Sequence, residues 1–377
     1  MSADPGVGEM PETMISLQNV TKRFDGGNDV AVNELSMDIY NGETVVLVGP
    51  SGCGKTTTMK MINRLVEPSS GTITMRGADI SKQDPVALRR KIGYVIQSIG
   101  LMPHRTISEN IATVPKLEGW DQPKIKDRTE ELISILDLDR GLLHRYPSEL
   151  SGGQRQRVGV ARALAADPPV MLMDEPFGAV DPIVRARLQD QFLDIQERLK
   201  KTIVFVTHDI DEAIKMADRI AILNKGGLME QYAAPEEILR EPANDFVKQF
   251  VGVERGLKRL ALIKVAEIEV EAGPVVSSDA SSSEARGAME KFGDDWAAVV
   301  DSGELKGWIG AGDLEGRDSV VSVSPKKFSA YVTAGSSLRQ ALDSIVTSRT
   351  QVAVVVDADE HYRGILTLDR VSKEIIS

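Results

Sequence analysis

The residues from Gly49 to Thr57 have the composition and spacing of a phosphate cradle. The run GPSGCGKTT follows an apolar stretch and opens a helical pattern, the context that a P-loop requires. Glycines let backbone N–H groups wrap phosphate oxygens, Lys55 reaches the β- and γ-phosphates, and the Thr56 hydroxyl binds Mg²⁺. We therefore expect a nucleotide site here, formed by Gly49, Pro50, Ser51, Gly52, Cys53, Gly54, Lys55, Thr56 and Thr57.

Carboxylates stand where this chemistry needs them, at the end of the apolar run PVMLMDE. Asp174 is placed to hold Mg²⁺, and Glu175 to polarise a water for in-line attack on the γ-phosphate. His208 follows the apolar run TIVFVT, and its expected place at the same sheet edge as Glu175 favours a catalytic role over the alternative of a structural cap. Gln97 ends the run IGYVIQ and is expected to be a catalytic residue that contacts Mg²⁺ and water, with an exposed loop residue as the alternative.

A second anion-binding pattern lies at LSGGQRQR, from Leu150 to Arg157. Ser151, Gly152, Gly153 and Gln154 precede a helical run, so free backbone N–H groups and a positive helix end would meet there. Phe24, upstream of the cradle, is either a packing aromatic or a ring that stacks on adenine. The residues alone leave open whether the two anion sites converge on one nucleotide.

The elements that must position these residues follow an α/β pattern. Near-continuous apolar runs such as ETVVLVG and TIVFVTH are typical of strands buried on both faces, and helical runs lie between some of them. This predicts a mostly parallel sheet with ligands at the carboxyl ends of its strands. Between residues 98 and 166 no strand is obvious, and we expect a helical insertion whose buried face is formed by Ile125, Leu132, Ile133 and Leu136.

Beyond residue 270 a weak internal repeat appears. Each half has an amphipathic helix, an apolar strand ending in Asp301 or Asp357, and a later glycine, Gly307 or Gly364. The expected division is a disordered tail at 1–13, a catalytic domain at 14–250, a linker at 251–270 and the repeat at 271–377.

Composition narrows the class of protein. The formal net charge is −11, which argues against a nucleic-acid partner. No apolar run approaches the ~20 residues of a membrane helix. Cys53 is the single cysteine, so the chain forms no internal disulfide and a cytoplasmic location fits best.

In order along the chain, GPSGCGKTT, Gln97, LSGGQ, MLMDEP, Asp181 and His208 resemble the Walker A, Q-loop, signature, Walker B, D-loop and switch histidine of ATP-binding cassette (ABC) ATPases. The resemblance implies a P-loop NTPase cassette with a β subdomain and a helical insert. It also implies a head-to-tail dimer in which each ATP lies between the Walker A of one subunit and the signature of the other. Asp181 joins the expected nucleotide contacts on this ground.

Longer segments, such as RYPSELSGGQRQRVGVARALAADPPVMLMDEP, resemble the ATPases of glycine betaine, carnitine or choline importers. The resemblance implies a separate permease, an extracytoplasmic substrate-binding protein and a place at the cytoplasmic face of the membrane. The alternatives are an importer of another small solute or a soluble ABC ATPase without a transport role.

The C-terminal repeat resembles a tandem of cystathionine-β-synthase-type (CBS) modules, with Thr367 and Asp369 closer together than in nucleotide-binding examples. It is interpreted as a regulatory domain. Three possibilities stay open at this point: a nucleotide effector near Asp313, Thr367 and Asp369, a response to ionic strength, or a structural appendage.

Overall fold

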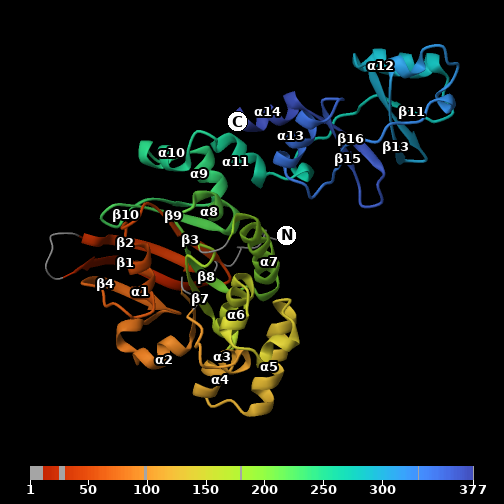
Figure 1. Cartoon of the computed structure of the whole chain (residues 1–377). Coiled ribbons are helices and arrows are strands. Elements are labelled where there is room, and N and C mark those ends of the chain that lie inside the picture. Colours follow the sequence, from red (N-terminus) through yellow and green to blue (C-terminus); the bar gives the residue numbers. More distant parts are fainter. Residues whose placement is uncertain (1–11, 25–29, 97–99, 179–180, 330, 377) are drawn as a thin grey trace, which may run out of the picture. The chain divides into compact units, whose positions relative to one another are not determined.

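The computed structural model describes residues 12–24, 30–96, 100–178, 181–329 and 331–376, and for 182, 183 and 376 it describes the backbone only. Contacts divide the chain into two compact units, and the boundary along the sequence falls between Phe250 and Val251. Figure 1 labels many of the elements of both units. We describe each unit by itself.

The first unit is built around a six-stranded sheet in the order β10-β9-β3-β8-β7-β6. Its strands are β3 (Thr44–Val48), β6 (Ile92–Val95), β7 (Val170–Asp174), β8 (Thr202–Val206), β9 (Arg219–Asn224) and β10 (Leu228–Ala233). All neighbouring pairs are parallel except β9 with β10. β3 and β8 are buried at every residue, as their apolar runs predict. The expected mostly parallel α/β sheet is confirmed.

A four-stranded antiparallel sheet accompanies it, in the order β2-β1-β4-β5. Its strands are β1 (Thr13–Arg23), β2 (Val30–Tyr40), β4 (Ser70–Met75) and β5 (Ala78–Asp79). The expected boundary of the tail at residue 13 is wrong, because β1 already begins at Thr13. Residues 1–11 lie outside the described part. Both sheets share one apolar core that includes Ile15 and Leu47.

Among its described residues, the stretch from 100 to 166 contains helices joined by loops and no strand. It contains α3 (Ile107–Ile111), α4 (Thr113–Leu117), α5 (Gln122–Ile135), two short 3₁₀ segments, η2 (Arg140–His144) and η3 (Pro147–Glu149), and α6 (Gly152–Leu164). The expected inward face is buried, since Ile125, Leu132, Ile133 and Leu136 are each no more than 5% exposed. Figure 1 shows α3, α4 and α5 gathered at one end of this unit.

The remaining helices of the first unit connect or flank its strands. They are α1 (Lys55–Ile62), the 3₁₀ segment η1 (Ile80–Lys82), α2 (Pro85–Arg90), α7 (Pro182–Leu199), α8 (Ile210–Met216), α9 (Pro235–Arg240) and α10 (Asp245–Val251). Within the described residues of the chain, we find no helix with the length and apolar content of a membrane-spanning segment.

The second unit repeats one small fold. Strands β11 (Val275–Val276), β12 (Trp296–Asp301) and β13 (Glu304–Gly310) form one sheet, and β14 (Tyr331–Val332), β15 (Val352–Val356) and β16 (Tyr362–Thr367) form the other. In each sheet the first pair is parallel and the second antiparallel. Gly307 and Gly364 occupy equivalent places with φ of 143°. Trp296, Trp308 and Val354 lie in a core shared by the two sheets.

Helices and 3₁₀ segments complete both halves: α11 (Arg255–Leu262), η4 (Val265–Glu267), α12 (Ser282–Phe292), η5 (Ala311–Leu314), η6 (Val320–Ser322), α13 (Leu338–Thr347) and α14 (Leu368–Ile376). The expectation of a linker at 251–270 is wrong. Leu260 and Val265 are almost completely buried in the second half's core beside Leu338, because α11 presents an apolar face to it.

Candidate functional site

The loop between β3 and α1 forms a cradle whose shape depends on glycine. Gly52 and Gly54 have φ of 79° and 95°, in the left-handed region that favours glycine. Gly54 is the N-cap of α1 and offers no side chain to the first turn. The first N–H groups of α1 therefore point outward without a side-chain cap, which makes this helix end an anion site.

A cavity of about 470 Å³ opens above this loop. It is lined by Ala31, Ser51, Gly52, Cys53, Gly54, Lys55, Thr56, Thr57, Glu175 and His208. The structure thus brings most of the expected cradle together with two of the three expected catalytic residues, Glu175 and His208. Ala31, from β2, is a lining residue that the sequence did not single out, because nothing in its type or spacing signals a contact.

Lys55 is a buried cation at the base of the cradle. It is 6% exposed, and its Nζ donates hydrogen bonds to the carbonyl oxygens of Gly49 and Pro50 at 2.7 and 3.0 Å. The thiol of Cys53 lies 3.6 Å from the same nitrogen and is fully buried. The loop carbonyls therefore hold the ammonium inside the cradle. Lys55 also lines the cavity, so the ammonium is close to the space that a phosphate would occupy.

Thr56 and Asp174 meet at the other side of the cradle. The Thr56 hydroxyl donates to the Oδ1 of Asp174 at 3.1 Å. Burial raises the pKa of Asp174, the Thr56 hydrogen bond lowers it, and the neighbouring charge of Glu175 raises it again. A hydroxyl and a carboxylate side by side are the hard oxygen donors that Mg²⁺ prefers, so these residues fit a magnesium ion.

Glu175 faces His208 across the ends of two neighbouring strands. The Nδ1 of His208 lies 3.3 Å from the Oε1 of Glu175. Glu175 has φ of 44°, a conformation uncommon for a residue with a side chain, and its N–H bonds to the carbonyl of Val206 at 2.9 Å. The backbone between β7 and β8 thereby fixes where this carboxylate points.

The second anion pattern lies in a different cavity. Ser151 caps α6 through a capping box, in which its hydroxyl accepts from the Gln154 N–H at 3.3 Å and the Gln154 Oε1 accepts from the Ser151 N–H at 2.9 Å. This cavity, of about 360 Å³, is lined by Ser151, Gly152, Gly153, Gln154, Arg157, Asp181, Val184, Arg187, Leu188 and Gln191. It shares no lining residue with the cradle cavity. Within one chain, the two expected anion sites therefore lie in separate cavities.

The contacts expected of Gln97 and Phe24 stay predictions. Gln97 lies outside the described residues. Phe24 follows β1, is 50% exposed and lies 5.1 Å from the ammonium of Lys22, measured to the ring centroid, but it is not among the residues that line the cavity.

Comparison with known proteins agrees with this geometry. The family models for ABC transporters and for the CBS domain match residues 32–178 and 320–377. The chain is 49% identical to the glycine betaine/carnitine/choline transport ATP-binding protein OpuCA of Bacillus subtilis, over 94% of both chains. It is 46% identical to the osmoprotectant import ATP-binding protein OsmV of Salmonella typhimurium, over 97% of both. The chain belongs to this family of ABC transporter ATPases.

A solved ABC cassette gives the same fold. The dimeric, post-hydrolysis structure of the cassette MJ0796, bound to ADP and Pi, matches with 33% identity and a TM-score of 0.53. The match covers 59% of this chain and 99% of the cassette. Members of this ABC ATPase family bind ATP and work as dimers with membrane permeases. We call the second cavity the signature cavity, because the LSGGQ segment lines it with Ser151, Gly152, Gly153 and Gln154.

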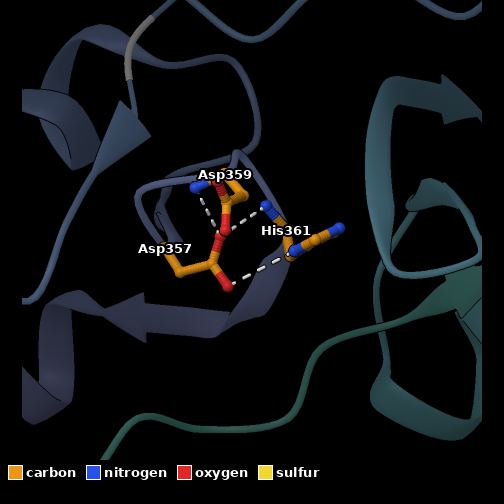
Figure 2. A group of neighbouring side chains, drawn as sticks. All are labelled: Asp357, Asp359 and His361. Carbon is orange, nitrogen blue, oxygen red and sulfur yellow. Dashed lines mark hydrogen bonds and ion pairs between the residues drawn. The ribbon is translucent and has the colours of Figure 1, made fainter.

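The ABC ATPase carries a further group of metal-ligand types in its second unit, at the turn between β15 and β16. Figure 2 shows Asp357, Asp359 and His361 close together. The Oδ1 of Asp357 accepts from the N–H groups of Asp359 and His361 at 3.0 and 2.9 Å, and Arg363 pairs with its Oδ2 at 2.7 Å. The carboxylate closes the turn and is neutralised by arginine, so we assign it a structural role.

Proposed function

We propose that this chain is the ATP-hydrolysing subunit of an importer for a quaternary-amine osmoprotectant such as glycine betaine, carnitine, choline or proline betaine. The observation that carries the hydrolytic part is the shared cavity of Lys55, Glu175 and His208. The substrate class rests on the names of the relatives.

The residues divide the work of hydrolysis. The cradle amides and Lys55 bind the β- and γ-phosphates, and Glu175 orients a water and accepts its proton, with His208 holding the carboxylate at 3.3 Å. Thr56 and Asp174, with Gln97, are the proposed ligands of Mg²⁺, which supplies positive charge to the phosphates when bound. Phe24 is the proposed stacking partner of adenine, because its exposed ring has a face free of the core.

The dimer is proposed to be head to tail. The signature cavity, with Ser151 and Asp181, is separate from the cradle of its own chain, so a second copy must bring the nucleotide that fills it. Each ATP would then contact the cradle of one copy and the signature residues of the other.

A groove of about 850 Å³ on the helical insertion is the proposed contact for the permease. It runs between the elements α3, α4, α5 and η2 and includes Ile125, Thr129 and Leu143. The groove is formed by the insertion alone, so a permease segment seated there would follow any movement of these helices. A peripheral place at the cytoplasmic face of the membrane and an extracytoplasmic substrate-binding protein complete the proposed importer.

The second unit is proposed to regulate the ATPase. A cavity of about 140 Å³ lies beside Asp313, whose carboxylate pairs with Lys326 at 2.6 Å, while Thr367 bonds to Glu271 at 2.7 Å. Thr367 and Asp369 do not line this cavity, so it would have to widen before a nucleotide effector could reach them. Because Lys326 occupies the Asp313 carboxylate, the effector would also have to displace Lys326 to contact Asp313. The exposed Asp313–Lys326 pair is also of the kind that salt screens, which supports a response to ionic strength.

The proposed function is tested by reconstituting the chain with its permease and substrate-binding protein in vesicles. Radiolabelled glycine betaine should enter only with ATP on the side of this subunit, and Glu175→Gln should abolish uptake. Uptake of another solute class, or ATP turnover that no permease alters, would contradict the proposed function.

A further inference from the structure

A buried carboxyl group joins two helices behind the catalytic pair. Glu212 of α8 and Gln189 of α7 are each 7% exposed. The Nε2 of Gln189 donates to the Oε1 of Glu212 at 2.9 Å. Burial raises the pKa of Glu212, hydrogen bonds from Thr207 and Gln189 lower it, and the charges of Asp209 and Arg185 act in opposite directions. A buried carboxyl group is costly unless its oxygens have such partners.

The other partner of Glu212 lies next to the switch histidine. The hydroxyl of Thr207 bonds to the Glu212 carboxyl group and also accepts from the N–H of Asp209 at 3.0 Å. Thr207 is 2% exposed, so this hydroxyl is shielded from water. The bonds fix the backbone on both sides of His208, and hence the direction from which its ring reaches Glu175.

Another part of the surface of α7 lines the signature cavity. Val184 and Leu188 line the signature cavity with Asp181, which directly precedes the helix. A Cβ built on Gly153 would lie 3.8 Å from both Val184 and Leu188, which is ordinary van der Waals contact. The start of α6 therefore packs directly on the N-terminal half of α7.

We propose that Glu212 is a positioning residue that, through Gln189 and α7, couples the signature cavity of a subunit to the His208–Glu175 pair of the same subunit. The inference rests on the proposed head-to-tail dimer, in which that cavity serves the partner's ATP and the pair serves the subunit's own. Occupancy of one ATP site would thus be transmitted to the catalytic pair of the other.

The test compares two links between the same two helices. Gln189→Leu removes the buried link, and Lys215→Ala removes an exposed one, the ion pair of Lys215 with Asp190 at 2.6 Å. ATPase rates of the full chain are measured against ATP concentration. For wild type and Lys215→Ala we expect a Hill coefficient approaching 2, the number of sites in the dimer. For Gln189→Leu we expect a Hill coefficient near 1 and a kcat about tenfold lower than for wild type. The Kd of the monomeric subunit for ATP should stay unchanged.

A rescue series separates positioning from stability. Glu212→Gln keeps an acceptor for Gln189 and should retain most of the cooperativity, whereas Glu212→Ala should lose it. If Gln189→Leu or Glu212→Ala lowers Tm but keeps the wild-type Hill coefficient and kcat, the role is structural and the inference is overturned. A wild type that dimerises without cooperativity also overturns it. A Glu175→Gln protein that forms no ATP-dependent dimer refutes the head-to-tail proposal itself, and this inference with it.

Discussion

Adding one methyl group to the cradle at two neighbouring positions separates backbone strain from steric overlap. Gly52 and Gly54 have similar φ of 79° and 95°, so alanine suffers similar strain at both, about 1–2 kcal/mol. A Cβ at Gly52 meets no atom within 4 Å, whereas one at Gly54 falls well inside 3.0 Å of the Ala31 carbonyl oxygen and 3.1 Å from Val32. Ala31 and Val32 belong to β2, whose ladder to β1 resists movement.

The gain from a less flexible unfolded chain is common to both substitutions and cancels in their difference. Overpacking of a fixed site costs about 1–3 kcal/mol. We therefore expect Gly54→Ala to unfold more easily than Gly52→Ala by about 1–3 kcal/mol. At a denaturant slope of about 3 kcal/mol/M, this corresponds to a midpoint lower by about 0.3–1 M urea.

The assay is urea unfolding of the ligand-free chain followed by circular dichroism. The transition of the first unit is recognised as the one that ATP moves to higher urea in wild type, since a ligand stabilises the state that binds it. Equal midpoints for the two variants, within about 0.1 M, would refute the argument that β2 confines the cradle at Gly54.

Three further predictions concern catalysis and regulation. Glu175→Gln should lower kcat by about 10²–10⁴-fold while ATP binding persists, and ATP should then hold a dimer on size exclusion; near-normal turnover would refute the assignment of Glu175. Ser151→Arg mixed with Lys55→Ala should recover part of the ATPase activity, because one site of the mixed dimer carries neither change; no recovery would indicate sites within one chain. A chain ending at Phe250, before the second unit, should keep its ATPase activity but lose the salt dependence of vesicle uptake; identical salt curves would leave the second unit a structural appendage.

The sequence predicted the cradle well because its chemistry is local. Gly54, Lys55 and Thr56 are consecutive, and the glycine φ and the start of α1 follow from their order alone. The pairing of Glu175 with His208 was also within reach, because parallel strands end at one edge of a sheet, and each residue closely follows its strand.

Features that depend on the packing of separate elements were not within reach. The contact of Gln189 with Glu212 joins residues 23 apart on different helices, and no residue type or spacing announces it. The segment 251–270 looks like a linker because it is short and charged. Its role in the second unit depends on an apolar partner, Leu338, that comes more than seventy residues later.

The capping box at Ser151 affects when the signature cavity can bind a phosphate. The Ser151 hydroxyl already bonds to an N–H of the first turn of α6, and its own N–H bonds to Gln154, so a phosphate that arrives at Ser151 must exchange hydrogen bonds with these two groups. Such an exchange yields little net free energy, so free nucleotide in solution has little to gain there. A nucleotide already anchored in a partner's cradle arrives at a high effective concentration and needs only that small gain. In the proposed head-to-tail dimer, the signature cavity would therefore respond only when the partner is both loaded with nucleotide and close.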